Sequence, residues 1–325
     1  MEPTQPAPTT EASPQSTDHG TPTAPPPTQP AYPLTVTDDD GTETVIESEP
    51  QTIVSLTPAN TELVFALGAG DRLRGGTDFD DYPAEAAALP DVVVGIEVQT
   101  EQIVDIAPDL VLAGGNNFTP PDDVARLRDL GMDVLVVYPE TFDEIYRDIT
   151  LIGVAIGRAA EADAIVDDIA ARVNEVLAFT SNIAEPPRTL YEIGYGPDIY
   201  GPAKDSFIED MVRIAGGDPI TSTDPAVFSI PLERLVDIDP EIIILGDAAY
   251  GTCPDSVLDR PGWEGMTAVQ ESAIRPVDDI VVTRPGPRSG EGLAALALAI
   301  HPDADIDPPT AGAELCVGTE ASPSP

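Results

Sequence analysis

The sequence predicts an α/β protein made of two Rossmann-like lobes with parallel central sheets, joined by one long α-helix. Three observations support this fold class. Short β-branched runs alternate with helical patterns, one fourteen-residue motif occurs twice, and a single long amphipathic stripe lies between the two copies. Alternation of strands and helices favours parallel sheets that are covered by helices, and the repeated motif indicates a duplicated unit.

Six runs of four or five residues are expected to form strands buried on both faces, because they are apolar and rich in β-branched residues. These runs are 52–56, 110–113, 134–138, 189–193, 242–245 and 280–283. Apolar residues at helical spacing predict the helices between them. These helices are 58–67, 100–106, 122–130, 141–156, 206–214 and 232–238.

One longer helix is expected over 159–182, where apolar residues recur at i, i+3 and i+4 from Ala162 to Leu177. At 1.5 Å per residue it would be about 35 Å long. Its position predicts a rigid strut between an N-terminal lobe at 34–158 and a C-terminal lobe at 183–307.

Both ends of the chain are of low complexity. Residues 1–33 contain ten prolines and seven threonines but no Ile, Val, Leu or Phe, so this segment is expected to be a disordered tether. A tether of this kind suggests that a targeting or lipid-anchoring segment was removed ahead of it, and that any membrane contact is made through the tether alone. Residues 308–325 form a second low-complexity tail.

The composition excludes several classes of function. The 58 acidic and 15 basic residues give a net charge of −43, which is the wrong sign for a nucleic-acid binder. Such acidity predicts a protein of a halophilic organism, although an acidic protein from ordinary medium is the alternative. The chain has only two histidines and lacks the common phosphate-binding and nucleophile motifs. No catalytic residue, metal site or resident cofactor is therefore expected.

The two cysteines, Cys253 and Cys316, fit neither a redox motif nor a metal knuckle. A disulfide between them would pin the C-terminal tail and would indicate an oxidising, extracytoplasmic compartment. Two unpaired thiols are the alternative.

The motif Glu101–Gly114 recurs as Glu233–Gly246 with six of fourteen positions identical, and each copy predicts a short helix, a proline turn and a buried strand. Two such lobes would face each other across a ligand cleft, because ligands of open α/β sheets lie beyond the carboxyl ends of the strands. Glu101 and Glu233 begin the two short helices. They either complement the helix dipoles or form one docking point per lobe for a two-fold partner.

Four motifs together resemble one family over residues 51–303: Ser55–Phe65, Asp81-Tyr82-Pro83, the two repeats, and Arg284–Arg288. The chain is similar to the substrate-binding proteins of ABC importers, in the class whose lobes are joined by a single helix. Within that class it most resembles the cobalamin (vitamin B12) binders, here of a haloarchaeal type, with binders of ferric siderophores and haem-type chelates as relatives.

The resemblance implies that the protein is not an enzyme. It implies a location outside the cytoplasm, with the chain tethered to the outer face of the cell membrane. Glu101 and Glu233 would form salt bridges with the permease dimer, which works with its ATPase subunits. Cobalamin would bring its own cobalt. The implied ligand contacts are Pro58, Phe79, Tyr195, Tyr200, Phe228 and Arg284.

The chain departs from the cobalamin binders at their aromatic walls. Two tryptophans of those proteins align with Gly95 and Gly114, and the only tryptophan here, Trp263, has no clear counterpart. The ligand therefore stays open between cobalamin and a ferric-siderophore or haem-type chelate. Two hypotheses from other functional classes remain: an α/β enzyme and a structural surface protein. Asn117 begins a glycosylation acceptor pattern.

Overall fold

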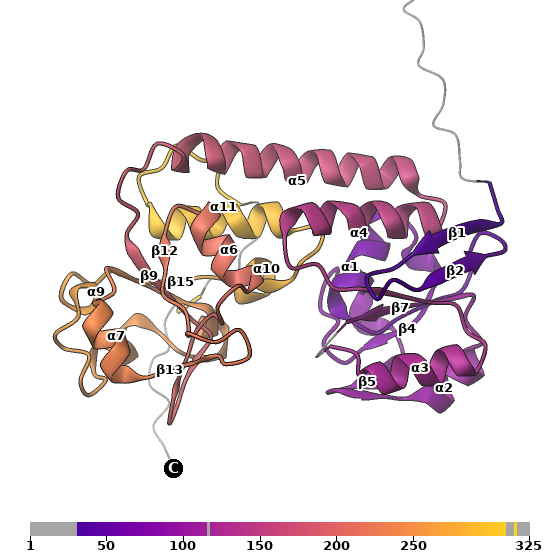
Figure 1. Ribbon diagram of the computed structural model, residues 1–325, viewed down its shortest axis with the longest axis horizontal. Helices are drawn as coiled ribbons and strands as arrows, with labels where there is room; N and C mark the ends of the chain where they lie inside the picture. The colour runs from indigo at the N-terminus through magenta and orange to yellow at the C-terminus, as the bar shows by residue number, and fades with distance from the viewer. Residues whose placement is uncertain (1–30, 116–117, 310–314, 317–325) are drawn as a thin grey trace, which may run out of the picture.

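The computed structural model describes residues 31–115, 118–309 and 315–316. Two α/β lobes lie side by side, and the long helix α5 (Ala159–Thr180) runs above both of them (Figure 1). The helix expected over 159–182 is thus present and ends two residues earlier. Its stripe of apolar residues is buried against the layer below, which is why this segment is helical throughout.

The N-terminal lobe is built on a six-stranded sheet of order β6-β5-β4-β3-β7-β8, in which only β6 is antiparallel. The strands are β3 (Ile53–Ser55), β4 (Leu73–Thr77), β5 (Asp91–Val94), β6 (Glu97–Val98), β7 (Leu110–Gly114) and β8 (Val134–Val137). The helices are α1 (Pro58–Ala66), α2 (Thr100–Ile106), α3 (Pro121–Asp129) and α4 (Phe142–Ala155), with short 3-10 turns η1 (Gly70–Arg72) and η2 (Ala86–Ala88). A separate hairpin, β1 (Leu34–Thr37) and β2 (Glu43–Ile46), precedes the sheet.

The C-terminal lobe has a four-stranded parallel sheet of order β12-β9-β14-β15. Its strands are β9 (Arg188–Glu192), β12 (Asp218–Pro219), β14 (Ile242–Leu245) and β15 (Ile274–Pro276). A small antiparallel sheet joins β10 (Gly194–Tyr195), β11 (Ile199–Tyr200) and β13 (Ser229–Ile230). The helices are α6 (Phe207–Ile214), α7 (Leu232–Ile238), α8 (Pro254–Leu258), α9 (Thr267–Gln270), α10 (Asp279–Thr283) and α11 (Ser289–Ile300), and η3 (Gly246–Tyr250) follows β14.

The two copies of the repeated motif fold alike. Helices α2 and α7 each have seven residues and each end in a left-handed residue, Ala107 at φ 51° and Asp239 at φ 56°. A proline follows in both copies, and then a buried strand. Asp109 accepts hydrogen bonds from the backbone just before β3, and Glu241 accepts one from the start of β9. The duplication seen in the sequence is therefore a duplication of structure.

One apolar core continues through both lobes. It includes Leu63 of α1 and Ile149 of α4 from the N-terminal lobe, Ile169 of α5, and Tyr191 of β9 and Leu293 of α11 from the C-terminal lobe. Helices α4 and α11 both pack against α5, which therefore covers the two lobes together (Figure 1). Two further core clusters lie inside single lobes. The lobes are thus joined by shared packing as well as by the chain.

The expectation of a strand at 280–283 was wrong, because this run forms the short helix α10. The acidic residue Asp279 lies in its first turn, and the hydroxyl of Thr283 donates to the Asp279 carbonyl at 2.8 Å. Val281 and Val282 are buried beside α11, so packing overrides the strand preference of a β-branched run. The edge strand is instead β15, whose middle residue Arg275 interrupts any apolar pattern. The other five expected strands are confirmed.

Candidate functional site

The carboxyl ends of the two sheets are linked by a loop of the C-terminal lobe that reaches the N-terminal lobe. Arg284, at the end of α10, places Nη1 2.5 Å from Oδ1 of Asp81, and its Nη2 donates to the carbonyl oxygen of Phe79 at 3.2 Å. The structure therefore brings together Arg284 and Phe79, two residues that the sequence predicts as ligand contacts from opposite lobes.

A second arginine of the same loop strengthens this link. Arg288 donates from Nε and Nη2 to the two carboxylate oxygens of Glu62 on α1, at 2.7 and 2.8 Å. Its guanidinium also lies 4.0 Å from the ring centre of Tyr82. Burial alone would lower the pKa of Arg288, but the hydrogen bonds and charge of Glu62 outweigh it and raise that pKa. Arg288 therefore joins the lobes instead of presenting a free charge.

The start of α1 contributes the N-terminal side of the site. Thr57 caps this helix by accepting a hydrogen bond from the backbone N–H of Asn60 at 3.3 Å, and the half-buried Pro58 begins the first turn. Phe79 is 59% exposed on the neighbouring loop. Asp80 holds that loop by accepting hydrogen bonds from Thr61 and Thr77, and burial raises the pKa of its carboxyl group.

The predicted aromatic residues of the C-terminal lobe lie on or beside the small antiparallel sheet. Tyr195 pairs with Ile199, whereas Tyr200 pairs with Gly194. Because side chains alternate between the faces of a sheet, the two tyrosines point to opposite faces. A ligand lying on one face can therefore contact only one of them. Phe228 precedes β13, and its carbonyl oxygen accepts a hydrogen bond from the backbone of Gly201 at 2.9 Å. All three aromatic rings remain exposed by 40–44%.

Two residues that the sequence did not single out as site residues surround Tyr195. The guanidinium of Arg260 lies 3.8 Å from the centre of the Tyr195 ring, and the Trp263 ring meets Tyr195 edge to face at 5.7 Å. Arg260 is paired with Glu192, the last residue of β9. The only hint in the sequence was that Trp263, which has no clear counterpart in the resembled family, lies close to Arg260 in the chain.

Glu101 and Glu233 occupy equivalent, exposed positions as the second residues of α2 and α7. Among the residues that the structure describes, neither carboxylate forms an ion pair. Each lobe therefore presents one accessible acidic group at the same point of the repeated unit.

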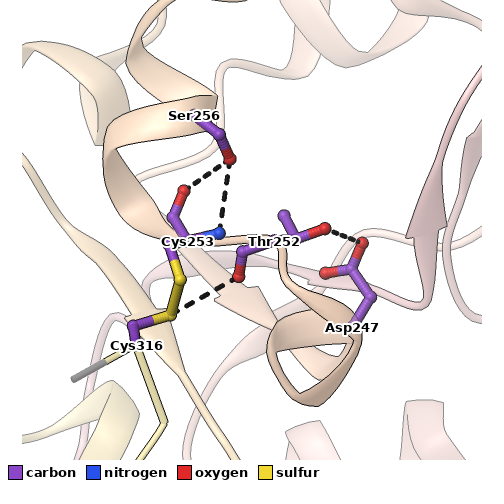
Figure 2. Close-up of a disulfide and its surroundings, with 5 residues drawn as sticks. All are labelled: Asp247, Thr252, Cys253, Ser256 and Cys316. Carbon is purple, nitrogen blue, oxygen red and sulfur yellow. Dashed lines mark hydrogen bonds between the residues drawn. A yellow bond between two sulfur atoms is a disulfide. The ribbon is translucent and has the colours of Figure 1, made fainter. Parts of the chain in front are cut away.

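The expected disulfide between Cys253 and Cys316 is present (Figure 2). Cys253 caps α8, and Cys316 Sγ lies 3.6 Å from the carbonyl oxygen of Thr252. The Thr252 hydroxyl donates to Asp247 of η3 at 2.7 Å. The C-terminal segment is thereby pinned beside the carboxyl end of β14.

Residues 1–30, 310–314 and 317–325 of the two tails lie outside the described residues, as does Asn117. Tyr32, near the end of the expected tether, donates a hydrogen bond to the carbonyl oxygen of Ala155 in α4. The chain is therefore already attached to the N-terminal lobe at this point.

Three surface hollows have volumes of about 380, 480 and 210 Å³, and none of them is lined by the residues predicted to contact a ligand. The smallest lies between the lobes and is bordered by Glu140 and Glu144 on one side and by Glu209 and Arg213 on the other.

Within the described ranges, no group of three or more potential ligands is placed to hold a metal ion. No helix there is both long and apolar enough to cross a membrane.

One buried acidic group, Asp148 of α4, lies near the N-terminal hairpin and not among the residues predicted to contact a ligand. Asp148 of α4 accepts a hydrogen bond from Nε of the neighbouring Arg147 at 3.1 Å, and Arg147 also pairs with Asp39. Burial, together with the negative charge of Asp39, raises the pKa of Asp148 to about 7. This carboxyl group therefore titrates near neutral pH.

Known proteins resemble this chain in both sequence and structure. The family model described as periplasmic binding protein matches residues 53–280. A Bacillus subtilis protein, described as an uncharacterized ABC transporter substrate-binding lipoprotein, is 33% identical over 276 residues, or 84% of this chain and 87% of its own. The cobalamin-binding protein of Halobacterium salinarum is 28% identical over 281 residues, covering 83% and 75% of the two chains. A solved Staphylococcus epidermidis structure, described as a possible iron-binding periplasmic solute-binding protein, has a TM-score of 0.65 at 27% identity, covering 78% and 100%.

Proposed function

Because the chain belongs to the periplasmic binding protein family, we propose that it is the substrate-binding protein of an ABC importer and that it captures cobalamin between its lobes. The observation that carries this proposal is the meeting of Arg284 with the loop of Phe79, which joins predicted contact residues of both lobes at one place. The cobalamin-binding relative in Halobacterium salinarum supports the choice of ligand.

The residues at this place suit a large ligand with flat apolar parts and polar edges. Exposed rings from both lobes can cover apolar surface, with Phe79 on one side and one of the two tyrosines, Tyr195 or Tyr200, on the other. Such rings contribute about 1 kcal/mol each beyond the area that they bury. The backbone N–H groups at the start of α1, behind Pro58, can donate to amide oxygens of a corrin ring. Arg284 can donate a directed hydrogen bond.

Delivery is proposed to occur through Glu101 and Glu233, which would pair with arginines of a permease dimer that is driven by its ATPase subunits. Their equivalent, exposed positions support this role. In concentrated salt the screening length falls to about 3 Å. Only groups in direct contact can then discriminate, which favours two discrete carboxylates over the diffuse acidic surface.

The proposed location is extracytoplasmic, with the chain tethered to the outer face of the membrane. The disulfide is consistent with an oxidising compartment, and one relative is described as a lipoprotein. The proposal involves no catalysis, no nucleic acid and no resident cofactor, since the cobalt would arrive with the ligand. The acidity of the chain is proposed to be an adaptation to high salt.

A ferric-siderophore or haem-type chelate is the second candidate ligand. The feature in its favour is that Gly95 and Gly114 fall where the resemblance to cobalamin binders implies tryptophans. The relative from Staphylococcus epidermidis, described as possibly iron-binding, supports the same alternative.

Isothermal titration of the full chain at high salt separates the candidates. We expect cyanocobalamin to bind with one site per chain and haemin or a ferric chelate to bind more weakly. Phe79→Ala should weaken binding about fivefold, from the loss of one ring contact. The matched control, Leu130→Ala, removes an exposed apolar side chain at the end of α3 and should leave binding unchanged. Tighter binding of a ferric chelate would select the second candidate, and binding of neither class would refute the proposal.

A further inference from the structure

A buried ion pair lies directly behind the small antiparallel sheet of the C-terminal lobe. Glu192 accepts two hydrogen bonds from the guanidinium of Arg260, at 2.5 and 2.7 Å, and the two side chains are only 0% and 5% exposed. Burial raises the pKa of Glu192, and Arg260 opposes that effect. The charge of Arg260 is therefore matched inside the protein and is not presented to a ligand.

The same guanidinium forms the base of an aromatic stack. It lies 3.8 Å from the ring centre of Tyr195 and 4.6 Å from that of Trp263. Trp263 is completely buried, whereas Tyr195 is 43% exposed. One side of the Tyr195 ring is thus held by buried partners, while the rest of it reaches the surface.

This support matters because the strand that carries Tyr195 is weak. Strand β10 has two residues and pairs only with the equally short β11. A side chain on such a hairpin would otherwise lose rotational freedom only when a ligand arrives, which lowers affinity. A cation stacked on a ring in a desolvated setting is a strong contact of its kind, so it can fix the ring beforehand.

We propose that Arg260 is a positioning residue that holds the Tyr195 ring, with Trp263 as its second support, as a ready-made wall for a flat conjugated ligand. The inference rests on the proposed function, because it assumes that Tyr195 contacts the ligand. It also accounts for the buried position of the only tryptophan, which takes no part in the exposed surface.

A double-mutant cycle tests this role. Arg260→Lys keeps a positive charge for Glu192 but loses the flat, forked guanidinium, and Tyr195→Leu removes the ring. Cyanocobalamin and haemin serve as probes in calorimetric titrations, and thermal unfolding shows which variants fold. We expect Arg260→Lys to weaken binding about fivefold to tenfold, the cost of ordering one freed side chain. In the Tyr195→Leu background the same substitution should change binding less than about twofold.

Two further measurements keep the test decisive. If Arg260→Lys fails to fold, Trp263→Phe takes its place in the cycle, with the same pattern expected at a smaller size. Without any ligand, the fluorescence of Trp263 should shift in both Tyr195→Leu and Arg260→Lys but not in Arg213→Lys, an exposed arginine of the same lobe.

The outcomes separate this inference from the proposed function. An equal loss of affinity in both backgrounds, or no loss in either, would overturn the role of Arg260 while leaving the proposed function intact. If the unmodified chain binds neither probe, the proposed function fails, and the wall for a ligand fails with it. Unchanged Trp263 fluorescence in the variants would overturn the stack itself.

Discussion

Replacing Arg288 with methionine should destabilise the protein strongly, because Glu62 would keep its charge but lose both of its hydrogen-bond donors. The Glu62 side chain is 4% exposed and that of Arg288 is 16% exposed. Removing one partner of a buried pair costs about 3–5 kcal/mol. The remaining exposure of Arg288 points to the lower end of this range. Loss of its contact with Tyr82 adds about 0.5–1 kcal/mol, so we expect a total of about 3–4 kcal/mol.

Urea unfolding at one fixed salt concentration measures this loss from the shift of the midpoint at constant slope. The matched control is Arg213→Met, which breaks an exposed pair with Glu209 on α6. Exposed pairs of this type contribute less than about 1 kcal/mol. Removing both charges at the interlobe pair, by Glu62→Gln with Arg288→Met, should cost less than Arg288→Met alone, because no unpaired buried charge remains.

The reasoning would be refuted if Arg288→Met and Arg213→Met cost the same within about 0.5 kcal/mol. It would also be refuted if the double substitution were more damaging than the single one. Small-angle scattering adds an independent check, since loss of this link should increase the radius of gyration if it holds the lobes together.

Three further predictions concern other parts of the chain. Glu101→Gln combined with Glu233→Gln should abolish uptake of labelled ligand by cells, while calorimetry shows affinity within a factor of about three. Cys253→Ser combined with Cys316→Ser opens a loop of 63 residues and should lower the free energy of unfolding by about 4 kcal/mol. The pKa of Asp148 is raised in the folded state to about 7 from 3.8, so its stabilising contribution is complete below pH 4 and is lost as the pH rises through 7. Asp148→Asn should remove up to about 4 kcal/mol of this pH dependence, as measured by urea unfolding between pH 4 and 8.

Each of these predictions has its own control. Uptake that persists in the double glutamine variant would rule out the docking role. A reducing agent should destabilise the unmodified chain but leave the double serine variant unchanged, and an effect on both would show that the disulfide is not responsible. If Asp148→Asn showed the same fall in stability with rising pH as the unmodified chain, another group would be titrating.

The elements that the sequence predicts well are those whose local pattern agrees with their environment. Strand β14 has four apolar residues in a row, and α5 has an apolar stripe throughout its length. Strand β4 was not predicted, because its two glycines and its arginine leave it without a continuous apolar run. Helix α10 was not predicted either, because its β-branched residues pack against α11, which no local pattern reveals.

The candidate site was predicted only where a motif fixed the position of a residue. Arg284 and Phe79, each predicted to contact a ligand, lie against each other although they are 205 residues apart in the chain; their contact with a ligand stays a prediction. The pair of Glu192 and Arg260 joins residues 68 positions apart, and neither belongs to a motif. The opposite directions of Tyr195 and Tyr200 follow from the pairing of β10 with β11, which depends on a turn geometry that spacing alone does not give.

The apolar interior that continues through both lobes also governs how the molecule loses its structure. Residues of α4, α5 and α11 belong to one core with residues of both sheets. Unfolding of either lobe would therefore expose buried apolar residues of the other lobe to water. The lobes consequently make up one cooperative unit. Cleavage of the chain within α5 would give two fragments, each of which exposes apolar residues that are buried in the intact protein.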